Sequence, residues 1–196
     1  GNALLSGQGP LQFDVLGDLS MAVFPGSDAG MALGVVSDAP TGTINFIVGG
    51  AFTVGGAGEA AATLAGPISG TVNSLQLGLL ENGVGILNVI EGASLSVNSD
   101  VLVGGAGLGT LNLTEGAGFQ AVNLTVDGPA GEDGSVLRLS GASGEVSSRM
   151  DLGLNLVVGN AKRGLWTMEG STRLEAGIII LGSQENATGS ATLSGS

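Results

Sequence analysis

The feature that most constrains this chain is a short repeated phrase. The pentapeptide VGGAG occurs at Val54–Gly58 and again at Val103–Gly107, and an apolar residue followed by Gly recurs along most of the sequence. The recurring positions are Leu33-Gly34, Val54-Gly55, Leu77-Gly78, Val103-Gly104, Val126 before Gly128, Val158-Gly159 and Leu181-Gly182. Their steps of 21 to 32 residues, without a helical pattern, are typical of solenoids in which each repeat is one coil. The sequence therefore predicts a parallel β-solenoid.

Two neighbouring coils at residues 85–133 show how the strands are expected to stack. An offset of 24 residues pairs Leu87 with Leu111, Asn88 with Asn112, Val89 with Leu113, Glu91 with Glu115 and Leu95 with Phe119. Because successive side chains of a strand face opposite sides, the aliphatic residues face inward, and Asn45, Asn88 and Asn112 form an outward amide ladder. We predict an all-β, single-stranded, parallel and right-handed β-helix of about seven coils, with three short strands and three corners in each.

The chain is expected to form one continuous solenoid over residues 33–196. Residues 1–32 fit the repeat poorly and are predicted to be an atypical N-terminal coil that caps the first strand edge. The longest step, between Val126 and Val158, predicts an insertion around Asp127–Gly134 and Gly144–Asp151. The last residues, ATLSGS, are predicted to lie in a new strand. We expect an exposed edge there, covered either by further repeats of a longer chain or by another subunit.

The charge distribution is strongly asymmetric. The chain has 17 acidic and 5 basic residues and a net charge of −12, which opposes binding to nucleic acid. All five basic residues follow residue 137, so one end of the solenoid is expected to be acidic and the other mixed. This asymmetry favours head-to-tail contact between copies. The residues expected at that contact are Arg173, Ala191, Thr192 and Leu193.

Composition excludes several kinds of chemistry. The chain has neither His nor Cys, which rules out imidazole bases, thiol nucleophiles and ordinary zinc sites, and no cofactor is expected. Mean hydropathy is high at +0.45, but the longest aliphatic run is Ile178–Leu181, far below the roughly 20 residues of a membrane helix. We therefore expect no membrane insertion.

Carboxylates are the remaining candidates for metal binding or catalysis. They are Glu91, Glu115 and Glu169 at equivalent corners, and Asp127, Glu132 and Asp133 in one loop. A column of acids could bind Ca²⁺ or act as a general acid and base, but solvated corners are the preferred interpretation. The GGAG strings resemble a calcium-binding repeat, yet Ala60 and Gly109 stand where that motif has Asp.

One phrase resembles a known class of repeats. The pattern G-x-G-x-L-x-V-x-x-G followed by an apolar-Gly pair, with the variant GLWTMEGSTRLEAGIIILG at Gly164–Gly182, resembles the β-solenoid repeats of type V autotransporter passengers and PEP-CTERM surface proteins of Gram-negative bacteria. The resemblance covers roughly Leu33–Ser196. It implies an extracellular stalk on the bacterial surface that presents or adheres, without an active site in the repeat.

We therefore expect a non-enzymatic extracellular structural protein, a stalk or fibre subunit that stacks axially on copies of itself or on adjoining repeats. One alternative is a carbohydrate-binding adhesin module that contacts surface glycans. In that case Trp166, the single tryptophan, would stack on a sugar ring, whereas a core position is the simpler interpretation. The other alternative is a polysaccharide lyase or hydrolase that uses the acidic edge.

Overall fold

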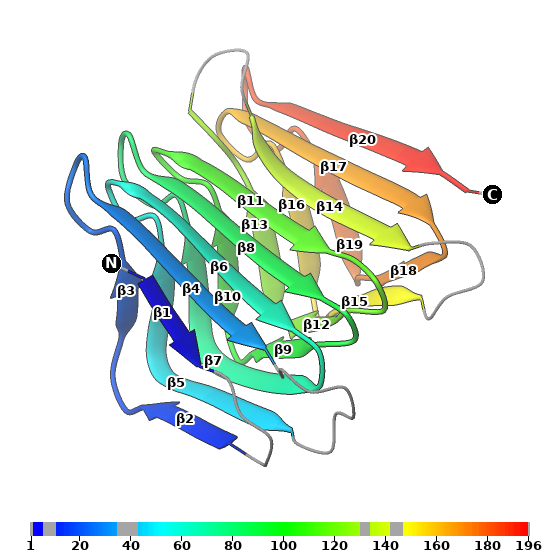
Figure 1. Cartoon of the computed structure of the whole chain (residues 1–196). Coiled ribbons are helices and arrows are strands. Elements are labelled where there is room, and N and C mark those ends of the chain that lie inside the picture. Colours follow the sequence, from blue (N-terminus) through cyan, green and yellow to red (C-terminus); the bar gives the residue numbers. More distant parts are fainter. Residues whose placement is uncertain (1, 6–10, 35–42, 130–133, 142–146, 196) are drawn as a thin grey trace.

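The chain winds as a solenoid of parallel β-strands. The computed structural model describes residues 2–5, 11–34, 43–129, 134–141 and 147–195 (Figure 1). Within these ranges all regular elements are strands, and all the strand pairs are parallel. Nowhere in this part of the chain is there a helix of the length and apolarity needed to cross a membrane. The predicted all-β parallel solenoid is confirmed.

Each coil contributes one strand to each of three faces. Face 1 stacks β1 (Asn2–Leu5), β4 (Asp28–Gly34), β6 (Glu59–Ala65), β8 (Val84–Ile90), β11 (Leu108–Leu113), β14 (Ser135–Gly141), β17 (Arg163–Gly170) and β20 (Thr188–Ser194). Face 2 stacks β2 (Leu11–Val15), the first half of β5 (Ile44–Val54), the first half of β7 (Ile68–Leu77), β9 (Ser94–Val97), β12 (Gly118–Ala121), β15 (Ser148–Leu152) and β18 (Thr172–Glu175). Face 3 stacks β3 (Leu19–Met21), the second halves of β5 and β7, β10 (Asp100–Val103), β13 (Asn123–Val126), β16 (Asn155–Val158) and β19 (Ile178–Leu181).

The strand order follows the chain from one end of the solenoid to the other. Face 1 contains eight of the described strands in sequence order, so the chain passes seven times from one strand of this face to the next. This agrees with the expectation of about seven coils with three strands each. Strands β5 and β7 each run through the corner between faces 2 and 3, where their register shifts between Val48 and Ala51, and they join these two faces into one sheet (Figure 1).

Equivalent side chains pile up inside the solenoid as predicted. Leu87 pairs in register with Leu111, and Leu95 with Phe119. All four are at most 2% exposed. The inward column of face 1 continues with Leu137, also fully buried. Because each coil lays its aliphatic side chains on those of the coil before, one continuous apolar core runs along the axis.

The repeat alignment was wrong at its first position. Val54 pairs with Met21 in the inward column of face 3, whereas Leu33 lies on face 1 and pairs with Leu64. The true first member of the apolar-Gly series is therefore Met21-Ala22. Ala22 has φ 52°, the left-handed conformation that Gly adopts at the equivalent corners. Since Ala occupies this corner in place of Gly, the sequence signal is missing there.

Four-residue corners connect face 3 to face 1 in every second coil, and they alternate with longer connections. The four-residue corners lie at 55–58, 104–107 and 159–162, the six-residue corners lie at 22–27, 78–83 and 182–187, and a longer connection joins β13 to β14 over 127–134, of which 130–133 lie outside the described ranges. Each described six-residue corner has positive φ at its first and fifth residues. The VGGAG phrases form short corners packed between long ones: a Cβ on Gly107 would collide with the backbone oxygens of Leu80 and Gly83. At the two VGGAG corners only Gly fits this close approach, whereas the third four-residue corner has Lys162 in the position of Gly58 and Gly107.

The N-terminal segment is built as part of the solenoid. Strands β2 and β3 pair in parallel register with β5, and β1 pairs with β4. The boundary expected between residues 32 and 33 falls inside β4, so the atypical sequence forms ordinary strands there. Of the predicted insertion, Ser148–Asp151 belongs to β15, residues 127–129 form a corner, and residues 130–133 and 142–146 lie outside the described ranges.

Candidate functional site

The last coil presents an apolar edge to solvent. Among the described strands, β18, β19 and β20 each pair with one neighbour only. Ile179 and Leu181 of β19 stand in register with Leu156 and Val158 of β16. The two β16 residues are fully buried, whereas Ile179 and Leu181 are 45% and 47% exposed. Residues of the type that the molecule buries elsewhere are therefore uncovered at this end.

The residues predicted for self-association lie on the same edge. Ala191, Thr192 and Leu193 belong to β20, and Arg173 belongs to β18. Leu193 is 66% exposed and continues an inward column of face 1 through its pairing with Met168. Sequence reasoning missed the contribution of β19 to this edge. The signal was present, because Ile178–Leu181 is the longest aliphatic run in the chain.

Charged residues form a ladder along the outer side of face 2 near this edge. Arg149 lies 2.8 Å from the Asp151 carboxylate on its own strand and 3.8 Å from Glu175 on β18. Arg173 in turn forms an ion pair with Glu175. Register places Arg149 beside Arg173 and Asp151 beside Glu175. Like charges therefore lie side by side in this register. Their repulsion is offset because each arginine also reaches a carboxylate, either on its own strand or diagonally on the next strand.

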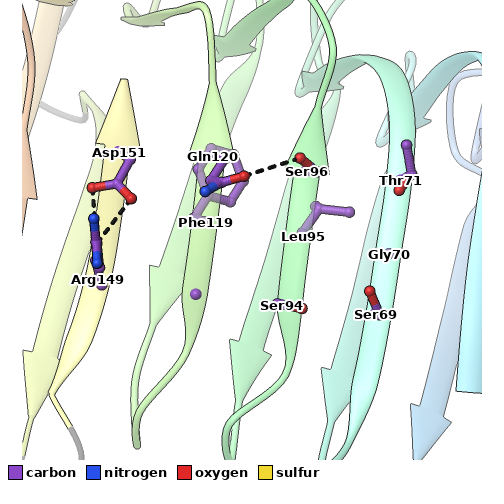
Figure 2. A pocket seen from close by; sticks show the side chains of 11 residues that line it. Ser69, Gly70, Thr71, Ser94, Leu95, Ser96, Phe119, Gln120, Arg149 and Asp151 are labelled. Atoms are coloured by element: carbon purple, nitrogen blue, oxygen red, sulfur yellow. Dashed lines mark hydrogen bonds and ion pairs between the residues drawn. The ribbon is translucent and has the colours of Figure 1, made fainter. Parts of the chain in front are cut away.

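A shallow trough lies farther along the same face (Figure 2). It holds about 520 Å³, and its outward side chains include Ser69, Thr71, Ser94 and Ser96, with the Arg149–Asp151 pair at one end. The Ser96 hydroxyl donates to Gln120 Oε1 at 3.4 Å. Rows of hydroxyls offer hydrogen bonds to a polar ligand. Phe119 is the aromatic side chain of the lining, and at 1% exposure its ring offers no stacking surface.

The proposed column of glutamates is only partly formed. Glu91 and Glu115 stand one coil apart at equivalent exposed corners with φ of 54° and 56°. Glu169 pairs with Ser140, and its neighbour Gly170 takes the position in register with Gly141. Glu169 is therefore one residue out of step with the other two. No cluster of three or more acidic residues suited to a metal ion occurs in the ranges that the structure describes.

The Asp127 side chain is buried and forms hydrogen bonds within the fold. Its side chain is 8% exposed, and its two carboxylate oxygens accept hydrogen bonds from the backbone amides of Ala161 at 3.0 Å and Lys162 at 2.9 Å. These bonds tie the 159–162 corner to the coil before it. The other two acids proposed for this loop, Glu132 and Asp133, lie outside the described residues.

Trp166 lies in the core, and two of the three asparagines form the predicted outward ladder. Trp166 is 6% exposed and lies in the inward column of face 1, so it is a core residue and its ring is not available to stack on a sugar. On the outer side of the same face, Asn112 Nδ2 donates to Asn88 Oδ1 at 2.8 Å, and Asn88 Nδ2 donates to Thr63 at 3.3 Å. Asn45 is not part of this ladder, because it lies on face 2.

Comparison of the chain with protein-family models, with curated proteins and with solved structures found no match. Of these surfaces, the apolar edge of the last coil exposes side chains in columns that the preceding coil buries.

Proposed function

We propose that this chain is a non-enzymatic structural element, a rigid β-solenoid that works as a stalk or fibre unit outside the cell and extends along its axis by strand pairing at the edge of β18, β19 and β20. The observation that carries the proposal is the exposure of Ile179 and Leu181 in columns that are otherwise fully buried. Such an edge combines unpaired backbone groups with apolar side chains, and it gains both hydrogen bonds and burial when another strand covers it.

The remainder of the described surface is consistent with a passive role. Glu91 and Glu115 are spread along a convex corner, and the Asp127 carboxylate is occupied by backbone amides. A polysaccharide lyase or hydrolase needs carboxylates that converge on a bound substrate. The resemblance to autotransporter and PEP-CTERM surface repeats supports the same proposal, as well as an extracellular or cell-surface location.

The proposal is tested with two isoleucines of one strand. Ile179 lies in an inward column and Ile178 lies on the outer side of β19, in register with Leu156 and Asn155 respectively, and both are exposed. We expect the purified chain to form axial oligomers in sedimentation velocity and electron microscopy. Ile179→Asp should abolish them, whereas Ile178→Asp should leave them intact. A chain that stays monomeric at high concentration, or equal effects of the two variants, contradicts the proposal.

Glycan binding in the trough of face 2 is a second candidate, favoured by the rows of Ser and Thr hydroxyls that line it. A glycan array probed with the chain and with Ser94→Leu tests this possibility, because the added side chain fills the trough. Binding that is unaffected by this substitution places any glycan site elsewhere.

A further inference from the structure

We propose that the outer side of face 3 is a contact surface for a second copy of this chain, with the two solenoids side by side. This contact goes beyond axial extension, because it uses the central strands β10, β13 and β16 and leaves the strand edges free. It is inferred from the shape, the spacing and the charge of this face.

A groove runs along face 3 over β10, β13 and β16, and it has a volume of about 410 Å³. Six of the residues that line it point outward and form two columns, because side chains alternate along each strand. The polar column contains Asp100, Asn123 and Asn155, and the ridge column contains Leu102, Thr125 and Val157. Val101 belongs to the lining between the two columns and is 2% exposed. The groove therefore lies between two parallel rows of side chains.

The two columns differ in chemistry. In the polar column, Asn123 Nδ2 donates to Asp100 Oδ1 at 2.9 Å, and Asn155 Nδ2 donates to Asn123 Oδ1 at 3.1 Å. These bonds hold the polar side chains to one another along one side of the groove. In the ridge column, Leu102 and Val157 are half-buried aliphatic residues. A partner that covers the ridge column therefore buries apolar surface without breaking the hydrogen bonds of the polar column.

The spacing along the groove matches a second solenoid. Residues that follow one another in either column belong to neighbouring strands, which lie about 4.8 Å apart. A single extended peptide places the side chains of one side about 6.8 Å apart, since each residue advances it by about 3.4 Å, so it does not keep register with the columns. The ridge column of a second copy repeats at the same strand spacing. Each ridge column can therefore lie in the groove of the other copy.

In this arrangement the two copies run in the same direction and are related by a two-fold axis parallel to the solenoid. The ridge columns meet at the centre, so Val157 of one copy lies close to Val157 of the other. The polar columns lie at the rim, where water still reaches Asp100. A two-fold contact uses the same surface on both copies, and an apolar centre with a polar rim is the usual anatomy of protein interfaces.

Charge favours face 3 over the other two faces for contact between copies. The chain has a net charge of −12, so two copies repel each other. The described strands of face 3 contain one charged residue, Asp100, whereas those of faces 1 and 2 contain five each. These are Asp28, Glu59, Arg138, Arg163 and Glu169 on face 1, and Asp14, Arg149, Asp151, Arg173 and Glu175 on face 2. Face 3 is therefore the face on which two copies can approach with the least repulsion.

The size of face 3 predicts a weak contact between single chains. Strands such as β10 and β13 have four residues, and seven described strands form the face. At about 3.3 Å per residue and 4.8 Å per strand, the face measures roughly 13 by 34 Å, or about 440 Å² on each copy. Standard interfaces bury about 800 Å² on each partner. We therefore expect a reversible dimer that forms at high protein concentration.

Opposite charges on the ridge column test the contact in an Ile179→Asp background, in which axial oligomers are not expected. In sedimentation equilibrium this background chain should form dimers. Val157→Lys and Val157→Glu should each weaken the dimer by more than about tenfold, because each brings two like charges together at the centre of the interface. An equimolar mixture of the two variants should recover the dimer, since the two-fold axis then brings opposite charges together.

The matched controls are Leu165→Lys and Leu165→Glu, which change a half-buried aliphatic residue on the outer side of face 1. They should leave the dimer unchanged, and circular dichroism should show the same strand content for all variants. Recovery on mixing separates the contact from a folding defect, which mixing does not repair. A background chain that stays monomeric, equal effects of the Val157 and Leu165 variants, or a mixture that does not recover the dimer overturns this contact. None of these outcomes bears on axial extension, which is tested in the chain with its natural Ile179.

Discussion

The Asp127 carboxylate provides the sharpest test of how the coils are held together. Asp127→Ala removes both acceptors of the Ala161 and Lys162 amides, which are bonded at 3.0 and 2.9 Å. A hydrogen bond to a charged group contributes about 1.5–3 kcal/mol. Since Ala161 and Lys162 are exposed, water replaces part of this loss, so each of the two bonds is expected to contribute about 1–1.5 kcal/mol. We expect the free energy of unfolding to fall by about 2–3 kcal/mol.

The measurement is equilibrium unfolding in urea, followed by circular dichroism and by the fluorescence of Trp166. The matched control is Glu81→Ala, which removes the same charge from an exposed corner residue and should change stability by less than about 0.5 kcal/mol. A loss no larger than that of the control refutes a structural role for Asp127. Chelation by EDTA should leave the natural chain unchanged, and a loss of stability equal to that of Asp127→Ala would assign the carboxylate to a metal ion.

Three further substitutions test the core, a close approach and the charge ladder. Leu111→Ala should cost about 3 kcal/mol because its column is fully buried, whereas Asn112→Ala on the outer side should cost about 1 kcal/mol; both are measured by urea unfolding. Gly109→Ala should destabilise the chain by about 1–3 kcal/mol, because a Cβ there collides with the backbone nitrogen of the neighbouring corner. Arg173→Glu should weaken axial oligomers in sedimentation, most at low salt, whereas Arg138→Glu in the middle of face 1 should not.

The stacking of the coils could be predicted from the sequence because it depends on periods that side chains reveal. The 24-residue offset that pairs Leu87 with Leu111 needs only alternation and like-with-like burial, and the structure has this register. The alignment of the first coil with the other repeats could not be predicted in the same way. Ala22 adopts the left-handed conformation without being Gly, so a search for apolar-Gly pairs moves to Leu33 and assigns it to the wrong face.

The roles of the polar residues depend on neighbours from other coils, which no local pattern encodes. Asp127 resembled a metal ligand within an acidic loop, yet its partners are amides 34 and 35 residues away. Asn45 shares the local phrase of Asn88, but three faces carry similar phrases, and only the pairing of whole strands shows that Asn45 is on face 2. Alternation along a strand separates inward from outward residues and does not identify the face.

Burial of inward side chains by the neighbouring coils accounts for both the stability of the interior and the apolar surface left exposed at the edge. A coil inside the solenoid is covered on two sides, so each inward Leu or Val gains burial from both neighbours, as Leu111 does between Leu87 and Leu137. The last coil is covered on one side, and half of that gain is still available to Ile179 and Leu181. Adding a coil in register therefore stabilises the end by about as much as it stabilises the middle. The proposed axial extension would gain backbone hydrogen bonds as well as burial, whereas contact between the faces would gain no backbone hydrogen bonds, because those are already paired there.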